Sequence, residues 1–173
     1  MPVASHSVVL NLTQQAAWAK LCDLSLAPYY VPGLTGCQFH PGATEGVGTS
    51  RRVLRKGVQY LDESVVQWRD GTGFVLRLHK GGNDSPFPFR EASFSYALQA
   101  EGNATRITLQ MRYSLRGGRL AEWLLAKSFN KVVRQIAENL KAYYETGRTQ
   151  NADMAVSTSN INCLLYTSPS PRD

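Results

Sequence analysis

The sequence is poor in the residue types that build metal centres and covalent cross-links. It has three cysteines and three histidines in 173 residues. Cys22 and Cys37 are not at a metal-ligand spacing, and no histidine pairs with another at i,i+4 or meets a cysteine at such a spacing. We therefore expect free thiols, a reducing compartment, no metal site and no cofactor.

Long apolar runs and targeting signals are also lacking. No stretch approaches the about 20 apolar residues that cross a membrane. The first residues, MPVASHSVVLNL, have no basic segment and turn polar at Asn11, which is too early for a secretory signal. These absences predict a cytoplasmic protein without a membrane span.

The charge is positive but dispersed. The net charge is +6, and 18% of residues are charged. The one dense cluster, Arg51, Arg52, Arg55 and Lys56, lies on a predicted hairpin, where alternation sends its members to opposite faces. No helix-turn-helix, zinc finger or aromatic-basic platform accompanies it, so we expect no specific nucleic-acid partner.

The last residues, 163–173, read CLLYTSPSPRD and resemble nothing before them. Back-translated, they match the reverse complement of a transposase mosaic end running into a sequencing adapter. We interpret Cys163–Asp173 as translated adapter read-through and exclude it from fold reasoning. Residues 148–162 are polar and aperiodic and are expected to be a disordered tail, which leaves one domain at residues 1–147.

Alternating residues and tight turns predict strands over most of the chain. We expect strands at His6–Leu12 and Leu34–Phe39, and five more between residues 47 and 115. A two-residue turn at Gly102-Asn103 fixes the register of the last hairpin. Its two strands then pair apolar residues on one face, namely Ala92, Phe94, Tyr96, Leu98, Ile107, Leu109, Met111 and Tyr113.

Two further turns, taken as two-residue turns at Lys56-Gly57 and Asp70-Gly71, set the remaining registers. Counting from Asp70-Gly71 places Phe74, Leu76 and Leu78 opposite Gln67, Val65 and Glu63. Counting from Lys56-Gly57 places Arg52 opposite Leu61, and Ser50 opposite Glu63. Glu63 and Arg52 then both point inward, whereas an apolar patch of Tyr60, Val66 and Trp68 lies on the outer face.

Helical periodicity predicts a short helix capped by Thr13, a helical turn in the proline-broken segment after it, and a long helix at the end of the domain. The long helix is expected from about Arg119 to Thr146, with Gly147 as its C-cap. Its apolar stripe comprises Leu125, Phe129, Val132, Val133, Ile136, Leu140 and Tyr143. Leu120, Trp123 and Leu124 lie off this stripe, so they are either covered by loops or exposed at the mouth of a cavity. Tyr29 and Tyr30 either edge the same mouth or pack the short helix against the long one.

This order of elements, and several segments, resemble the START-like (SRPBCC) superfamily, in particular its polyketide cyclase/dehydrase and lipid-transport branch. The resemblance covers nearly all of residues 3–147. It is carried by AAWAKLCDLSLAPYYVPGLTGCQF, GVGTSRRV, LDESVVQW, PFPFREASFSYAL, TRITLQMRY and NLKAYYETG. It implies an α+β helix-grip fold, in which a curved antiparallel seven-stranded sheet surrounds a long C-terminal helix, with two short helices after the first strand. It also implies a cavity between the sheet and that helix for a small hydrophobic molecule.

Three functions remain open. The first is a carrier or sensor of a lipid or polyketide-like ligand, with Glu63 and Arg52 anchoring a polar head group. The second is a cyclase or dehydratase that uses Glu63 and Arg52 as its catalytic groups. The third is an interaction module or homodimer formed through the outer sheet face. The candidate ligand-binding residues are Ser50, Arg52, Leu61, Glu63, Phe74, Leu76, Leu78, Phe94, Tyr96, Leu109, Met111, Tyr113, Phe129, Val133 and Ile136.

Overall fold

The structure is a computed structural model that describes residues 1–150. Within this range the chain forms one seven-stranded antiparallel sheet in the order β1-β7-β6-β5-β4-β3-β2. The strands are β1 (Val3–Leu10), β2 (Leu34–Phe39), β3 (Ser50–Arg55), β4 (Tyr60–Arg69), β5 (Gly73–His79), β6 (Phe89–Glu101) and β7 (Ala104–Leu115). The expected helix-grip architecture is confirmed.

Short helices connect the first two strands, and one long helix follows the last. The helices are α1 (Gln14–Leu21), the 3-10 turn η1 (Leu24–Leu26), α2 (Ala27–Tyr30) and α3 (Gly118–Thr146). As predicted, the Thr13 hydroxyl caps α1 by accepting from the Ala16 N–H. Gly147 ends α3 in the left-handed conformation, at φ 71°, with its N–H donating to the Tyr143 carbonyl. No helix of the described residues is long and apolar enough to span a membrane.

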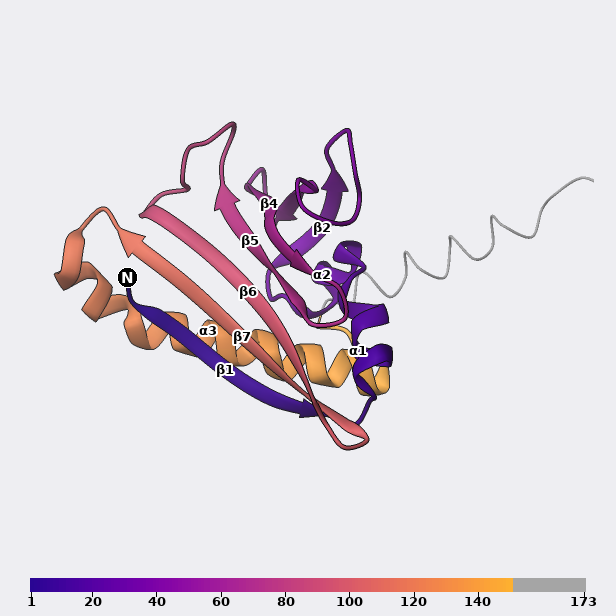
Figure 1. The fold of residues 1–173 in the computed structure, drawn as a ribbon. Coiled ribbons are helices and arrows are strands. Elements are labelled where there is room, and N and C mark those ends of the chain that lie inside the picture. Colours follow the sequence, from indigo (N-terminus) through magenta and orange to yellow (C-terminus); the bar gives the residue numbers. More distant parts are fainter. Residues whose placement is uncertain (151–173) are drawn as a thin grey trace, which may run out of the picture.

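The long helix lies across one face of the sheet, where it packs on β1 and β7 (Figure 1). Val133, Ile136 and Leu140 of α3 are buried against this face, in line with the predicted stripe. Burial of such side chains stabilises the fold by about 1.5–3 kcal/mol each. The helix therefore defines the inner face of the sheet, on which a cavity can form.

The register of the last hairpin is confirmed in full. Tyr96 pairs with Leu109, and Phe94 pairs with Met111. The inner-face residues of both strands are buried, as the alternation predicts.

The β4–β5 register is confirmed at one end and wrong at the other. Val65 lies opposite Leu76 as expected, but a bulge follows, and Phe74 lies opposite Trp68 instead of Gln67. An extra residue on one strand turns the following side chains to the other face. Trp68 therefore packs inward, with its ring centroid 5.5 Å from that of Phe74 and 5.1 Å from that of Trp18. The prediction of an apolar outer patch made of Tyr60, Val66 and Trp68 is therefore wrong, because Trp68, the largest of the three side chains, is not on the outer face.

The β3–β4 register is wrong by one residue. The connection is a three-residue loop, closed by the Arg55 N–H donating to the Gln59 carbonyl at 2.9 Å. Arg51 consequently lies opposite Glu63, and Arg52 lies opposite Asp62. A one-residue shift moves every side chain of a strand to the other face. Arg51, and not Arg52, is the arginine that points inward.

Candidate functional site

A cavity of about 440 Å³ lies between the inner face of the sheet and the middle of α3. Its walls come from strands β2 to β7, the α2–β2 connection, the segment before β6, and α3. Arg55, Lys80, Phe87 and Val132 line it and are exposed, so the cavity opens to solvent beside them. We call these four residues the cavity mouth.

Many of the predicted site residues line this cavity. They are Leu61, Glu63, Leu78, Phe94, Tyr96, Met111, Phe129 and Ile136. They converge because β4, β5, β6 and β7 are neighbours in the sheet and each turns alternate side chains toward α3.

Five other predicted residues belong to the core without lining the cavity. They are Phe74, Leu76, Leu109, Tyr113 and Val133. Tyr113 packs on Phe129, with ring centroids 4.5 Å apart. Phe74 is enclosed by Trp68 and Tyr96. These side chains support the residues of the cavity wall.

Ser50 and Arg52 lie on the outer face, and their predicted inward orientation is wrong. The cause is the one-residue shift of β3. The Arg52 guanidinium donates to both carboxylate oxygens of Asp62, at 2.8 and 3.0 Å. Ser50 accepts from the Ser64 hydroxyl at 3.1 Å and lies 3.3 Å from Nδ1 of His40. A Glu63–Arg52 pair does not form.

The outer-face pair makes a pH-dependent contribution to stability. The hydrogen bonds from Arg52 lower the pKa of Asp62, with a further contribution from the Gly81 N–H. A carboxyl group with a lowered folded-state pKa stabilises the protein above its unfolded pKa, and this contribution disappears as pH falls through the folded value.

We therefore expect Asp62→Asn to lower the free energy of unfolding at pH 7, and the difference from the wild type to shrink below about pH 4. Urea unfolding at several pH values measures this effect. Glu138→Gln is the matched control, because it removes an exposed carboxylate that pairs with Arg134 in α3, and exposed pairs contribute little. A difference that is constant from pH 7 to pH 3 would contradict the assignment.

The inner face carries a buried ion pair. Arg51 Nη2 lies 2.6 Å from Glu63 Oε2, and Arg51 Nε donates to the same oxygen at 2.8 Å. Arg51 also donates to the carbonyl of Leu24 in η1. Arg51 is 3% exposed, and the Glu63 side chain is 11% exposed. The pair thus joins β3 to β4, toward the β2 edge of the sheet, and ties the helical connection to the sheet.

The partners of Arg51 keep it charged. Burial lowers the pKa of its guanidinium, but Glu63 raises it and prevails, with smaller contributions from Tyr30, Cys37 and Tyr96. An isolated buried cation would be costly, and a hydrogen-bonded counter-charge removes most of that cost. Arg51 therefore offers a permanent positive charge at the cavity wall.

Neutral polar groups surround this charge. Burial raises the pKa of Tyr30 to about 12, although Arg51 and a hydrogen bond with Tyr96 oppose the rise. Burial also raises the pKa of Tyr96, and it raises the pKa of the Cys37 thiol against the opposing effect of Arg51. The phenols and the thiol are therefore uncharged at neutral pH. Arg51, Glu63 and Tyr96 form the polar end of an otherwise largely apolar cavity.

Tyr29 and Tyr30 do not edge the cavity mouth. The Tyr29 ring stacks on Tyr143 at 5.2 Å, and Tyr30 meets Tyr144 edge to face at 6.0 Å. Both tyrosines therefore pack the short helix against the long one, because α2 lies against the C-terminal half of α3.

Sequence reasoning missed several residues of the site. Arg51 is missed because the two-residue turn expected at Lys56-Gly57 turns Arg52 inward in its place. Phe87 and Phe89 belong to a proline-broken segment that gave no strand or helix signal, although its repeated aromatics are unusual for a solvated loop. The other missed wall residues include Val31, Pro32, Leu34, Val53 and Val132.

Comparison with known proteins agrees with this geometry. Residues 1–145 match the family described as "Polyketide cyclase / dehydrase and lipid transport". The chain belongs to this family. It is 25% identical over 139 residues to an uncharacterized protein of Mycobacterium tuberculosis, covering 80% of this chain and 81% of the relative.

Solved structures share the fold, among them the two described next. A START superfamily protein from Mycobacterium smegmatis superimposes with a TM-score of 0.67 at 12% identity, covering 83% of this chain and 97% of the other. The di-domain ARO/CYC BexL from the BE-7585A biosynthetic pathway gives a TM-score of 0.62 at 10% identity, covering 83% of this chain and 47% of the other. The structures support the fold, and the family supports a role in hydrophobic-ligand binding or cyclisation.

Proposed function

We propose that the protein binds one small hydrophobic molecule in the 440 Å³ cavity and acts as its carrier or sensor. The observation that carries the proposal is that the cavity wall combines apolar side chains with a small group of hydrogen-bonding side chains. Leu78, Phe94 and Met111 offer apolar surface, while Arg51, Glu63 and Tyr96 offer hydrogen-bonding groups at one place. Ligand pockets are generally apolar with a few convergent polar groups that fix orientation.

The polar end favours a ligand with one polar group. Arg51 can donate to a carboxylate, carbonyl or hydroxyl oxygen, and Glu63 can accept from a hydroxyl. A lipid or polyketide-like molecule combines such a group with an apolar body. Because Arg51 and Glu63 neutralise each other at 2.6 Å, the polar end needs no charged group from the ligand.

Native purification followed by solvent extraction and mass spectrometry tests this proposal. A small apolar molecule should be recovered in an amount close to that of the protein. The absence of such a mass, together with no binding of apolar fluorescent dyes, would remove the basis of the carrier function.

A cyclase or dehydratase is the second candidate, and the position of Glu63 favours it. The carboxylate lines the cavity beside Tyr96 and Arg51, where it could take a proton from a bound polyketide-like substrate. We expect Glu63→Gln to lower turnover of a confirmed substrate by about a hundredfold or more, because positioned general bases contribute about that much. Turnover at the wild-type rate would exclude Glu63 as the base.

A further inference from the structure

Large apolar side chains protrude from the first turns of α3 and from the segment before β6. Leu120, Trp123 and Leu124 are 69%, 74% and 61% exposed, and Phe87 is 84% exposed. The three residues of α3 follow one another at i, i+3 and i+4 and so share one face of the helix. Together with Phe87 they form what we call the docking surface.

The docking surface and the cavity share one residue. Phe87 itself lines the cavity. The Arg116 N–H donates to the Pro88 carbonyl at 3.0 Å, and the Phe89 ring lies 5.6 Å from that of Phe129. These contacts hold Pro88 beside the turn that precedes α3, and the first residue of β6 against the middle of α3. Figure 1 shows the first turns of α3 extending past the ends of β6 and β7, so this end of the molecule projects outward.

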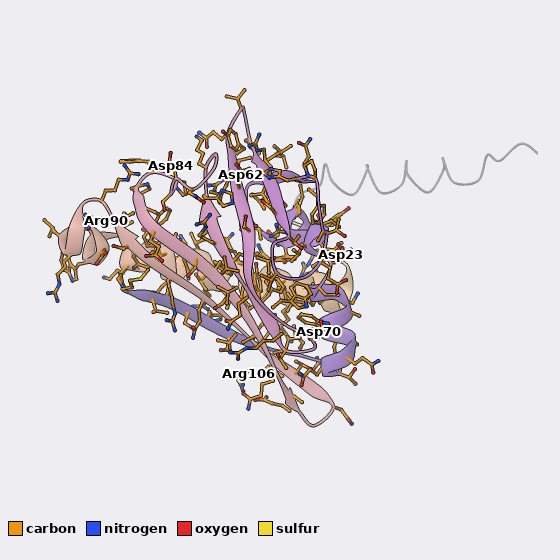
Figure 2. The ribbon with its side chains drawn as sticks, turned by 45° about the horizontal axis from the view of Figure 1, so that its top comes forward. Asp23, Asp62, Asp70, Asp84, Arg90 and Arg106 are labelled. Atoms are coloured by element: carbon orange, nitrogen blue, oxygen red, sulfur yellow. The ribbon has the colours of Figure 1, made fainter. Side chains whose placement is uncertain are left out.

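Positive charge accompanies the exposed apolar side chains. Between residues 116 and 131 the exposed charged residues are all cations, namely Arg116, Arg119, Lys127 and Lys131. The acid in this stretch, Glu122, is half-buried and accepts from the Leu115 N–H at 3.1 Å. Arg90 lies at the same end of the molecule (Figure 2), where its neighbour Glu91 offsets it.

We propose that the docking surface binds the surface of an anionic phospholipid bilayer. A helix face with Trp and Leu flanked by cations is the pattern of segments that lie in a membrane interface, and tryptophan is enriched there. Lys127 and Lys131 continue the face of Leu120 and Leu124 along α3 and would meet lipid headgroups. Juxtamembrane Lys and Arg residues are attracted to anionic leaflets.

Charge argues for a bilayer over a second copy of this chain. A twofold dimer through this surface would bring the same cations of both copies together. An anionic bilayer neutralises them instead. Docking does not depend on the proposed ligand. If the ligand proposal holds, docking would also bring the cavity mouth to the membrane, where an apolar molecule can pass without crossing water.

Vesicle co-sedimentation and tryptophan fluorescence test the proposal. The probes are phosphatidylcholine vesicles with and without phosphatidylglycerol. We expect binding to the anionic vesicles that weakens as salt rises, and a blue shift of the emission. The shift reports on Trp123, because the chain has three tryptophans and the other two, Trp18 and Trp68, already pack on each other at 5.1 Å.

Two variants separate the apolar contribution to vesicle binding from the electrostatic one. Trp123→Ser should weaken vesicle binding and abolish the shift. Lys127→Gln/Lys131→Gln should weaken binding about tenfold or more, since each cation near an anionic surface contributes about the free energy of a severalfold change. Val66→Ser, on the outer sheet face and 50% exposed, should leave binding unchanged. Because all these side chains are exposed, unchanged circular dichroism spectra are expected.

Three results would overturn the proposal. The first is no preference for anionic vesicles. The second is equal loss of binding in Val66→Ser and Trp123→Ser. The third is a dimer in sedimentation that Trp123→Ser dissociates, which would assign the surface to a second copy. A variant with a bulky side chain in the cavity, Leu61→Trp, should still bind vesicles, so failure of the ligand proposal leaves this test intact.

Discussion

Arg51→Met is expected to destabilise the protein by about 3–5 kcal/mol, because it leaves the Glu63 carboxylate buried without its counter-charge. Arg51 is 3% exposed and contacts Glu63 through two nitrogen atoms at 2.6 and 2.8 Å. The substitution also removes the donor to the Leu24 carbonyl, so the connection through η1 should loosen. Urea unfolding followed by circular dichroism measures the loss.

The double variant Arg51→Met/Glu63→Leu separates the charge from the packing. Replacing both partners by apolar residues should restore most of the lost stability, since a buried pair contributes little beyond a well-packed apolar pair. Arg134→Met is the matched control, because Arg134 pairs with Glu138 at 2.8 Å on the exposed face of α3, and we expect little change from it. A double variant as unstable as Arg51→Met would contradict the explanation.

A bulky side chain in the cavity should strongly weaken ligand binding while the fold is retained. Leu61 is half-buried in β4, and its side chain lines the cavity. A tryptophan at this position would extend a large ring from the wall into the cavity of about 440 Å³. We expect Leu61→Trp to weaken binding of an apolar fluorescent probe by about a hundredfold, which corresponds to about 2.7 kcal/mol.

The control for this variant is Val66→Trp, which places the same side chain on the outer face of the same strand. Val66 is 50% exposed and does not line the cavity. Its probe titration should match that of the wild type. Equal weakening by both tryptophans would mean that the probe binds elsewhere or that β4 itself is disturbed.

The parts of the fold that could be predicted are those where local signals agree. The β6–β7 hairpin combines strict alternation with a two-residue turn at Gly102-Asn103, and every predicted pair is present. The end of α3 at Gly147 was also predictable, because a glycine in the left-handed conformation stops a helix without strain. In both cases neighbouring residues carry enough information to determine the geometry.

The inward orientation of Arg51 could not be predicted from alternation and turn residues alone. Lys56-Gly57 fits a two-residue turn, but the chain adds Val58 to the loop, and this one residue exchanges Arg51 with Arg52. The bulge between Val65 and Gln67 has a similar effect on Trp68. Turn length and bulges depend on packing across the sheet, which a single strand does not encode. The carboxylate, Glu63, was predicted on the correct face, and its partner was not.

Native mass spectrometry of the wild type and Leu61→Trp, purified in parallel, shows whether the cavity between the sheet and α3 holds one small hydrophobic molecule. We expect a wild-type peak heavier than the polypeptide by one small-molecule mass, and a Leu61→Trp peak without that addition. The same adduct on both proteins, or no adduct on either when an apolar ligand is supplied, would contradict it.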